Sequence, residues 1–433
     1  MDVVPSFLDL LQAIAVVMHA PTQATFVQLA TGWLFARKRT VTQMIVCSGA
    51  QELKHFGSFH RFFSAAAWSL DAVGIAVFGL LAPLLPEGPV FLIVDDTLAR
   101  KGGRKIFGAG WHHDPLTKDV KAKTSWGHSW VVLAVSLKFA ALPRRTFCLP
   151  PMFRLYLNHK EADKRRRAHR TRPELALQMV QKLCRLQKCR TFHLLGDSAY
   201  GGRGVRDGLP SNCELTSVLR LDARLYDAPA PQTGRGRRRR RGERLPSPQE
   251  MLDGRLRHAE IEVYGRSDQV RIGSCVARTN QHPEQPLRVV AVESRVKNRG
   301  RQAIFSTVAE ASDEQVLQWY CMRWTVEVTF QCSKQHLGFE EPPCWSRRSV
   351  ERTAPVAMLL YSLVLLWFST KGHAAWKLST TPWYPQKQQP SFADMLVALR
   401  QQCIKSHLKS LALPGAERRK IMKLLQNTAA LAA

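Results

Sequence analysis

Two short apolar segments, each followed closely by aspartate, constrain the fold of this chain most. Val90 to Val94 precedes a pair of aspartates, and Thr191 to Leu195 precedes a Gly-Asp step. Apolar runs of this length bounded by turn residues predict buried strands. A helical pattern from Pro173 to Gln187 lies between them, and a further strand is expected at Trp130 to Leu137. These segments predict an α/β core whose sheet has mixed strand pairing.

The segments around this core have different textures. The N-terminal part repeats apolar residues at helical spacing and carries Arg37, Lys38 and Arg39 between two expected helices, with Thr22 and Thr40 as candidate helix starts. A DNA-binding helical domain and a plain helical bundle fit this pattern equally well. We expect a helical region at 1–86, the first part of the core at 87–203, a β-rich insertion at 204–312, the second part of the core at 313–375 and a basic C-terminal region at 376–433.

The charge balance indicates the kind of partner. The 433 residues include 63 Lys+Arg against 34 Asp+Glu, a formal net charge of +29, and the basic residues are spread along the chain. Nucleic acid is favoured over a membrane surface because the basic residues are not confined to one amphipathic helix. The apolar run Val356 to Phe368 is shorter than the roughly 20 residues that cross a bilayer, so a buried helix is expected. Scattered cysteines and a start unlike a signal peptide predict a reducing, cytoplasmic location.

Two glycine-rich basic segments are candidate phosphate contacts. Gly234 to Arg244 is almost pure Arg and Gly, and it either binds phosphates or is simply solvated. The other segment is Lys101 to Lys105, whose glycines Gly102 and Gly103 lack the spacing of a nucleotide-binding P-loop. The nearby His112, His113 and His128 fit packing or surface placement better than metal binding. The candidate residues for DNA contact in the two segments are Lys101, Arg104, Lys105, Arg237, Arg238 and Arg239.

The acidic residues point to metal-dependent chemistry. Cutting and rejoining DNA uses two divalent cations, which are held by carboxylates. Asp95 or Asp96, and Asp197, each follow an apolar strand, where open α/β sheets keep their sites. A lone aspartate after a strand is more often a turn or cap residue, but two such places favour a metal site when a third acidic residue accompanies them.

That third residue lies in an expected helix. Tyr320, Arg323 and Lys334 stand at minus seven, minus four and plus seven from Glu327. On a continuous helix these offsets place all four side chains on one stripe. Glu327 can then face a metal while the two basic residues reach phosphates on either side of it. A surface ladder of salt bridges is the alternative interpretation.

The segment Tyr320 to Gly338 has the spacing Y-x2-R-x3-E-x6-K. It resembles the Tyr-Arg-Glu-Lys signature of bacterial insertion-sequence transposases of the DDE type. Asp-Asp-Thr at Asp95 to Thr97 and Gly-Asp-Ser-Ala-Tyr at Gly196 to Tyr200 resemble the same family's two aspartate motifs. The resemblance covers roughly residues 90–339 and implies an RNase H-like catalytic core interrupted by a β-rich insertion.

The resemblance also implies roles for individual residues. One residue of the first pair, together with Asp197 and Glu327, would bind Mg²⁺, for which Mn²⁺ can substitute. Asp95 is favoured over Asp96 because the family often has Asp-x-Thr there. Tyr320, Arg323 and Lys334 would grip the transposon end.

The implied reaction is endonucleolytic cutting at the ends of a mobile element, followed by transfer of the freed 3′-hydroxyl into target DNA. The implied partners are double-stranded DNA and a second copy of the chain on paired ends, in the bacterial nucleoid rather than at a membrane. A catalytically inactive, transposase-derived DNA-binding protein is the main alternative. A repair or recombination nuclease without strand transfer is the second.

Overall fold

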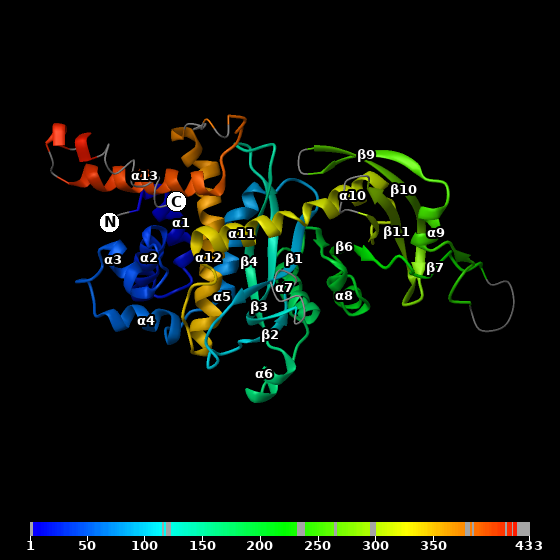
Figure 1. Cartoon of the computed structure of the whole chain (residues 1–433), viewed down its shortest axis with the longest axis horizontal. Coiled ribbons are helices and arrows are strands. Elements are labelled where there is room, and N and C mark those ends of the chain that lie inside the picture. Colours follow the sequence, from blue (N-terminus) through cyan, green and yellow to red (C-terminus); the bar gives the residue numbers. More distant parts are fainter. Residues whose placement is uncertain are drawn as a thin grey trace.

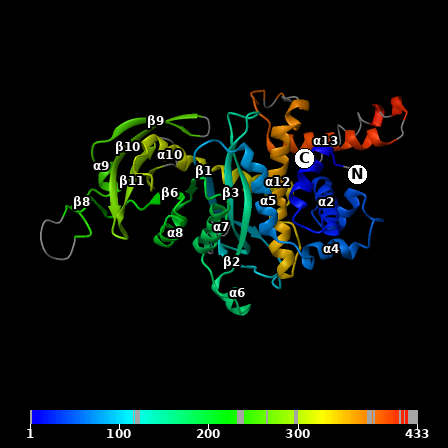
Figure 2. The same ribbon diagram turned by 180° about the vertical axis from the view of Figure 1, so that it is seen from behind.

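The computed structural model describes residues 3–114, 117, 123–231, 239–263, 266–294, 300–376, 382, 385–411, 414–417 and 419–421. Helices gather at the N-terminal end, a twisted sheet occupies the middle, and a β-rich lobe forms the other end (Figure 1). The view from behind shows the same three-part arrangement (Figure 2). The protein is thus a mixed α/β molecule, as the sequence predicts.

The middle of the molecule is a five-stranded core. Its strands are β1 (Val90–Arg100), β3 (Thr124–Lys138), β4 (Thr146–Tyr156), β5 (Phe192–Leu195) and β6 (Cys213–Leu219). They lie in the order β4-β3-β1-β5-β6, with β3 antiparallel to its two neighbours and β5 parallel to its two. The short β2 (Gly110–His113) pairs with the end of β3. Three antiparallel strands followed by two parallel ones are consistent with an RNase H-like core.

Helices cover this core sheet on both faces. α7 (Arg172–Leu186) connects β4 to β5 after the short α6 (His159–Lys164), and a capping box of Thr171 and Glu174 fixes its start. α5 (Leu70–Leu81) and α12 (Arg347–Thr370) also pack against β4. Because both faces are covered, the middle of β3 is buried continuously rather than in alternation.

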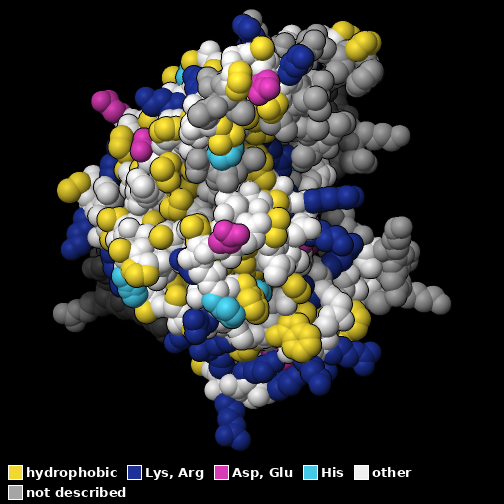
Figure 3. All heavy atoms as spheres, turned by 90° about the vertical axis from the view of Figure 1, so that its left-hand side faces the viewer, with side chains coloured by type: hydrophobic (Ala, Val, Ile, Leu, Met, Phe, Trp, Pro, Cys, Tyr) yellow, Lys and Arg dark blue, Asp and Glu magenta, His cyan; other side chains and the backbone are white. Residues whose placement is uncertain are grey.

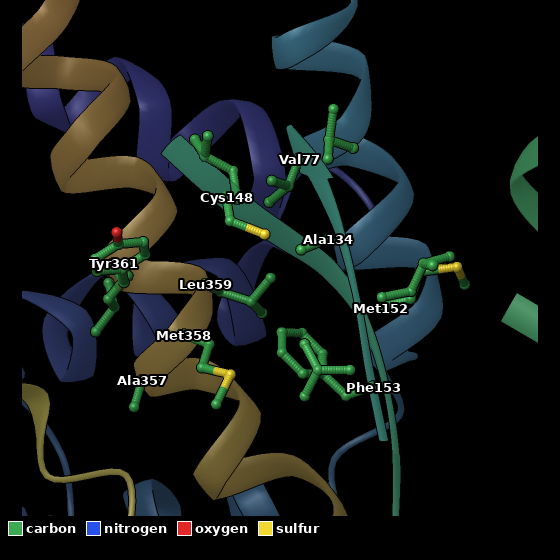
Figure 4. Packing of buried hydrophobic residues seen from close by; sticks show 14 of the residues in the cluster. Val77, Ala134, Cys148, Met152, Phe153, Ala357, Met358, Leu359 and Tyr361 are labelled. Atoms are coloured by element: carbon green, nitrogen blue, oxygen red, sulfur yellow. The ribbon is translucent and has the colours of Figure 1, made fainter. Parts of the chain in front are cut away.

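α12 is the central helix of the core. Its apolar side chains, among them Met358, lie toward Phe153 of β4 in Figure 4, whereas Met152 points to the other side of the strand. By length and hydropathy alone this 24-residue helix could cross a membrane, but 94% of its most apolar window is buried inside the protein. The buried helix expected at Val356 to Phe368 is confirmed within α12, which is longer than the apolar run.

The N-terminal helices belong to the same hydrophobic core. They are α1 (Pro5–Ala15), α2 (Ala20–Phe35), α3 (Val41–Ser48), α4 (Phe56–Ser64) and α5, followed by the short η1 (Ala82–Leu84). Thr40 caps α3 as expected, whereas Thr22 lies inside α2, which already begins at Ala20. The helical pattern from Phe62 to Leu81 is divided between α4 and α5, and Ser69 caps the second of them.

The basic cluster of this region is only partly exposed. Arg37 and Lys38 are exposed, but Arg39 is buried and donates to the backbone of His336, at the end of α11 (Thr325–Leu337). Trp33 also donates to the carbonyl of Leu337 at 2.8 Å. The N-terminal helices are thus anchored to the helix that carries Glu327, and Arg39 is a structural residue.

The β-rich region continues the core sheet rather than forming a separate layer. Its strands are β7 (Leu225–Tyr226), β8 (Arg244–Leu245), β9 (Arg257–Val263), β10 (Arg266–Thr279), β11 (His282–Ser294) and β12 (Arg301–Ser306). β12 pairs with β6, so one sheet of 12 strands runs through both parts. α8 (Arg203–Gly208) precedes β6, and α9 (Pro248–Asp253) packs on β10 and β11. β6, which falls inside 204–312, is a strand of the core.

The helix expected from Tyr320 to His336 is interrupted. α10 (Asp313–Met322) ends at Met322, and α11 begins at Thr325. Between them, Arg323, Trp324, Val326 and Glu327 each donate to the carbonyl three residues earlier. This tighter turn breaks the regular helical stripe that the sequence predicted. After α12, the short η3 (Gly372–Ala375) leads toward α13 (Phe392–Ser410), which packs on α12.

Candidate active site

Asp95 and Asp197 lie side by side because their strands are parallel neighbours. Ile93 of β1 is in register with Leu195 of β5, so two residues further along, the two aspartates are level. β5 ends at Leu195, whereas β1 continues to Arg100 along its antiparallel partner β3. The strand expected to end at Val94 is therefore longer, and Asp95 and Asp96 lie inside it. They still lie directly after the point where the parallel pairing of β1 with β5 ends.

Asp95 is a largely buried carboxylate next to other acids. Its side chain is 14% exposed and receives Arg323 Nη1 on Oδ2 at 2.7 Å. The backbone N–H of Asp96 donates to Oδ1 at 2.8 Å. Burial raises the pKa of Asp95 to about 7, and the charges of Asp197 and Asp96 add to this rise while Arg323 opposes it. The pocket therefore disfavours an anionic Asp95 unless positive charge lies beside it.

Asp96 belongs to the other face of the sheet, since neighbouring residues in a strand point in opposite directions. Arg172, at the start of α7, places Nε 3.2 Å from Asp96 Oδ2. Tyr200 donates its hydroxyl to Oδ1 at 3.1 Å. Burial raises the pKa of Asp96, and Asp197 adds to the rise, while Arg172 and the Tyr200 hydrogen bond lower it. Arg172, Tyr200 and Ser129 thus already hold Asp96, in contrast to the single side-chain donor on Asp95.

Asp197 is fixed by the turn that follows β5. Its Oδ1 caps the short helix η2 (Ser198–Tyr200) by accepting from the backbone N–H of Ala199 at 2.9 Å. Ser217 of β6 donates to the Asp197 carbonyl at 2.7 Å. No hydrogen bond from a described residue reaches the second carboxylate oxygen of this half-buried side chain. This turn residue is therefore both a helix cap and a neighbour of Asp95.

Glu327 lies one turn beyond Arg323, in the first turn of α11. Its side chain is 46% exposed, and its Oε1 is 3.8 Å from Arg323 Nη2. Burial raises the pKa of Glu327, while the Arg323 charge opposes the rise. Arg323 therefore lies between Asp95 and Glu327 and contacts both carboxylates.

The other two residues of the signature have different surroundings. Tyr320 is 9% exposed and packs in the core of the β-rich region, 5.7 Å from the Arg323 guanidinium. Lys334 donates to the carbonyl of Leu98 at 2.7 Å and pairs with Glu340 at 3.2 Å. The interruption at Arg323 and Trp324 separates the stripe into a buried half and a more exposed half.

The acidic residues do not form a complete metal-binding group. In the part of the chain that the structure describes, no three His, Cys, Asp or Glu side chains are gathered around one point. Asp95 and Asp197 are adjacent, but the guanidinium of Arg323 stands where Glu327 would have to join them. The carboxylates nevertheless suit a hard divalent cation, since such a cation would stabilise the anionic form of Asp95, whose pKa is raised mainly by burial and further by the charges of Asp197 and Asp96.

The expected phosphate contacts also differ from one another. Arg104 and Lys105 are exposed, as is Arg239, whereas Lys101 donates its amine to the carbonyls of Glu340 and Pro342 at 2.5 and 3.2 Å. Arg237 and Arg238 lie outside the described residues. His112 and His128 are buried, with the pKa of each lowered to about 4 mainly by burial. Their surroundings are those of packed residues.

Two residues next to the aspartates were not singled out from the sequence. Tyr200 belongs to the Gly-Asp-Ser-Ala-Tyr motif, so its position three residues after Asp197 was an available signal. Arg172 lies in a stretch with many arginines, and nothing in its local pattern separates it from Arg170 or Arg167. Only the docking of α7 on β3 and β4 brings it to Asp96.

Comparisons with known proteins identify the family. The family model described as DDE superfamily endonuclease matches residues 15–271, more than half of the chain. This match contains Asp95, Asp96 and Asp197 and ends before Glu327. No curated protein matches the chain. This family description is consistent with the adjacent aspartates at the end of the parallel strand pair. The chain belongs to the DDE superfamily of endonucleases.

Proposed function

We propose that the protein is a DNA transposase of the insertion-sequence type. It cuts at the ends of a mobile element and transfers the freed 3′-hydroxyl ends into a target duplex, acting as a homodimer on paired ends. The observation that carries this proposal is that Asp95 and Asp197 are level at the end of the parallel strand pair, where Arg323 contacts both Asp95 and Glu327. The net charge of +29 supports a DNA substrate.

Asp95, Asp197 and Glu327 are the residues that would hold Mg²⁺ or Mn²⁺. Such cations ready the attacking oxygen and stabilise the leaving oxygen during transfer of a phosphoryl group. Asp95 is preferred to Asp96 because Arg172 and Tyr200 already engage Asp96 from the other face. Asp96 then acts as an anchor that orients α7 and the turn after β5.

In this proposal Arg323 binds either the Asp95 carboxylate or a DNA phosphate. Without substrate it neutralises Asp95 and approaches Glu327. A DNA phosphate offers the same bidentate chemistry that a guanidinium finds in a carboxylate. Release of Arg323 from Asp95 to a phosphate would leave Asp95, Asp197 and Glu327 free to share cations. Lys334 reaches the same end of the DNA from the next turns of α11.

The test is cleavage and joining of labelled transposon-end DNA with Mg²⁺, using Glu327→Gln, which keeps shape and removes charge. Exposed Glu52, in the N-terminal helical part, supplies the control Glu52→Gln. We expect Glu327→Gln to lose both products while still binding DNA, and Glu52→Gln to match the wild type.

Other results would change the assignment. Equal activity of Glu327→Gln and the wild type would remove Glu327 from the metal site. DNA binding without cleavage by the wild type would favour the catalytically inactive DNA-binding protein, in which the Arg323 contacts are permanent. Cleavage without joining would favour a nuclease without strand transfer.

A further inference from the structure

A large basic cavity lies away from α11. It has a volume of about 1220 Å³ and is bounded by α4, α5, β4, the segment before α7 and the start of α12. Seven arginines and two acidic residues line it. In Figure 1 the start of α12 lies near α4 at the lower side of the molecule, and Figure 3 shows Lys and Arg side chains gathered along the lower part of this end. We call it the arginine cavity.

The positive charge of the arginine cavity is not balanced from within. Asp71 is already neutralised by Arg154 at 2.7 Å and Lys182 at 2.6 Å. Glu351 pairs with Arg347 at 3.0 Å. Both acidic residues of the lining are thus paired, and the remaining arginines of the lining leave a net positive field.

Two of these arginines are free to bind a ligand. Arg166 and Arg167 are exposed, and no hydrogen bond or ion pair with another described residue holds either guanidinium. Arg348 and Arg352, by contrast, donate to backbone carbonyls around Ala65 and Ala66 and so shape the wall. The cavity therefore combines arginines held in its wall with exposed arginines at its rim, and an exposed guanidinium can bind a phosphate group.

The size and lining favour a polymer backbone over a small molecule. Small-molecule pockets are usually about 300–1,000 Å³ and mostly apolar, whereas this cavity is larger and rich in arginine. Its aromatic side chains are already engaged. Trp68 stacks on Phe62 at 5.0 Å and lies under the Arg352 guanidinium, and Trp130 is 1% exposed. No free aromatic face in the lining is offered to a base, so contacts would go to phosphates and would not read sequence.

The arginine cavity lies beside β4 at the edge of the core sheet, where β3 separates it from β1, and no residue of α11 lines it. Trp130 in its wall pairs in register with Thr97, two residues beyond Asp95 in β1. Arg170 in its rim lies two residues before Arg172, which holds Asp96. A strand transferase must bring a second duplex to the carboxylates that cut the first, and the signature residues of α10 and α11 are assigned to the first.

We propose that the arginine cavity binds the phosphate backbone of the target duplex, without regard to its sequence. This inference rests on the proposed transposase function and adds a surface that the Tyr-Arg-Glu-Lys residues do not supply. Each arginine that contacts a phosphate releases counterions, and each lost contact lowers the slope of log affinity against log salt by about 0.9.

The first experiment compares two double variants with the same loss of charge. Arg166→Ala with Arg167→Ala changes the cavity rim, and Arg185→Ala with Lys188→Ala changes exposed residues at the far end of α7. Fluorescence anisotropy with two unrelated labelled duplexes over a salt series gives the slope. We expect the rim variant to lower the slope by about 1.8 on both duplexes and the control to stay near the wild type. An unchanged slope in the rim variant, or an equal fall in the control, overturns the proposal.

The second experiment separates the target duplex from the DNA that flanks the cut. In the same rim variant we expect end cleavage at the wild-type rate and joining to a second duplex reduced tenfold or more, on the order of 1.4 kcal/mol. Reduced cleavage with joining of pre-cut ends intact would assign the cavity to flanking DNA and overturn the target assignment. If the wild type cleaves no DNA, the proposed function fails, while the salt slope still decides whether the cavity binds a DNA backbone.

Discussion

Arg323 Nη1 lies 2.7 Å from Asp95 Oδ2, and both side chains are largely buried, with exposed fractions of 9% and 14%. The same guanidinium is 3.8 Å from Glu327. One arginine therefore contacts two of the three carboxylates proposed as metal ligands. Its charge opposes the repulsion that Asp197 and Asp96 exert on Asp95.

Replacing Arg323 with Gln should destabilise the protein more at high pH than at low pH. The folded-state pKa of Asp95 is already raised to about 7, above its ordinary 3.8, and without Arg323 it rises further. At pH 8 a buried, unpaired Asp95 anion costs on the order of 3 kcal/mol of unfolding free energy. At pH 5.5 Asp95 takes up a proton and most of this cost disappears. Urea unfolding at the two pH values measures it.

The control for that variant is the double change Arg323→Gln with Asp95→Asn. Removing both charges should recover most of the stability lost at pH 8, because no unpaired anion remains. An equal loss at both pH values, or no recovery in the double variant, would mean that Arg323 acts through packing rather than through charge.

The buried His193 should make the protein sensitive to acid. Its ring lies between Phe91 and Trp319 and forms a 2.7 Å hydrogen bond with Thr216. Burial lowers its pKa from 6.5 to about 4, so the unfolded state binds its proton first as the pH falls. Stability is full above pH 6.5 and is lost as the pH falls toward 4, by about 2 kcal/mol at pH 5.

The variant His193→Gln keeps a hydrogen-bonding group and cannot be protonated. We expect its unfolding free energy to change less between pH 7.5 and pH 5 than that of the wild type, although its stability at pH 7.5 is lower. Exposed His60, changed to Gln, is the control and should keep the wild-type pH dependence. A parallel pH curve for His193→Gln would contradict the argument.

Of the three basic residues in the loop after β1, we expect Lys101 to stabilise the fold, and Arg104 and Lys105 to contact DNA. Lys101 donates to the carbonyls of Glu340 and Pro342. Lys101→Ala should therefore lower the unfolding free energy by about 1–2 kcal/mol and the melting temperature with it. Exposed Arg104 and Lys105, changed together to Ala, should leave the melting temperature within error and weaken DNA binding. Thermal denaturation of both variants measures the stability effect, and fluorescence anisotropy with labelled DNA measures the effect on binding. A double variant with wild-type DNA affinity would show that this loop does not contact DNA.

Much of the core was predictable because its signals are local. Apolar strands such as Val90 to Val94, and helices such as Pro173 to Gln187, carry their periodicity within a few residues. The sequence placed Asp95 and Asp197 each after a buried strand, where open α/β sheets keep their sites, but it did not show that the two strands are parallel neighbours. In the structure the two strands are parallel neighbours, and β1 continues past the aspartates because β3 supplies a longer partner.

What the sequence did not reveal depends on tertiary contacts. The interruption between α10 and α11 has no proline or glycine to mark it. Arg39 matched a DNA-contacting pattern with Arg37 and Lys38, yet it is buried against Glu341 and the end of α11. Arg172 became a partner of Asp96 only through the docking of α7. A guanidinium has the same local signature whether it binds a carboxylate, a carbonyl or a phosphate, so its partner depends on the fold.

Two glycines of α5 provide a stability test of how this helix meets the core sheet. A Cβ added at Gly74 would lie 1.9 Å from the carbonyl oxygen of Pro151 in β4, whereas one at Gly79 would meet nothing within 4 Å. Gly74→Ala must therefore push α5 away from β4 and should cost about 1–3 kcal/mol. Gly79→Ala should instead stabilise the protein by roughly 0.8 kcal/mol, because alanine favours a helix interior.

The Gly74→Ala and Gly79→Ala variants should also differ in DNA cleavage. Asp71 of α5 binds Arg154 of β4 and Lys182 of α7, so a displaced α5 disturbs the strand and helix that hold Arg172 near Asp96. We therefore expect Gly74→Ala to lower DNA cleavage as well as stability, and Gly79→Ala to leave cleavage unchanged. Chemical denaturation and the cleavage assay at 25 °C measure both. If Gly74→Ala were as stable as the wild type, the contact between α5 and β4 would not limit the side chain at position 74.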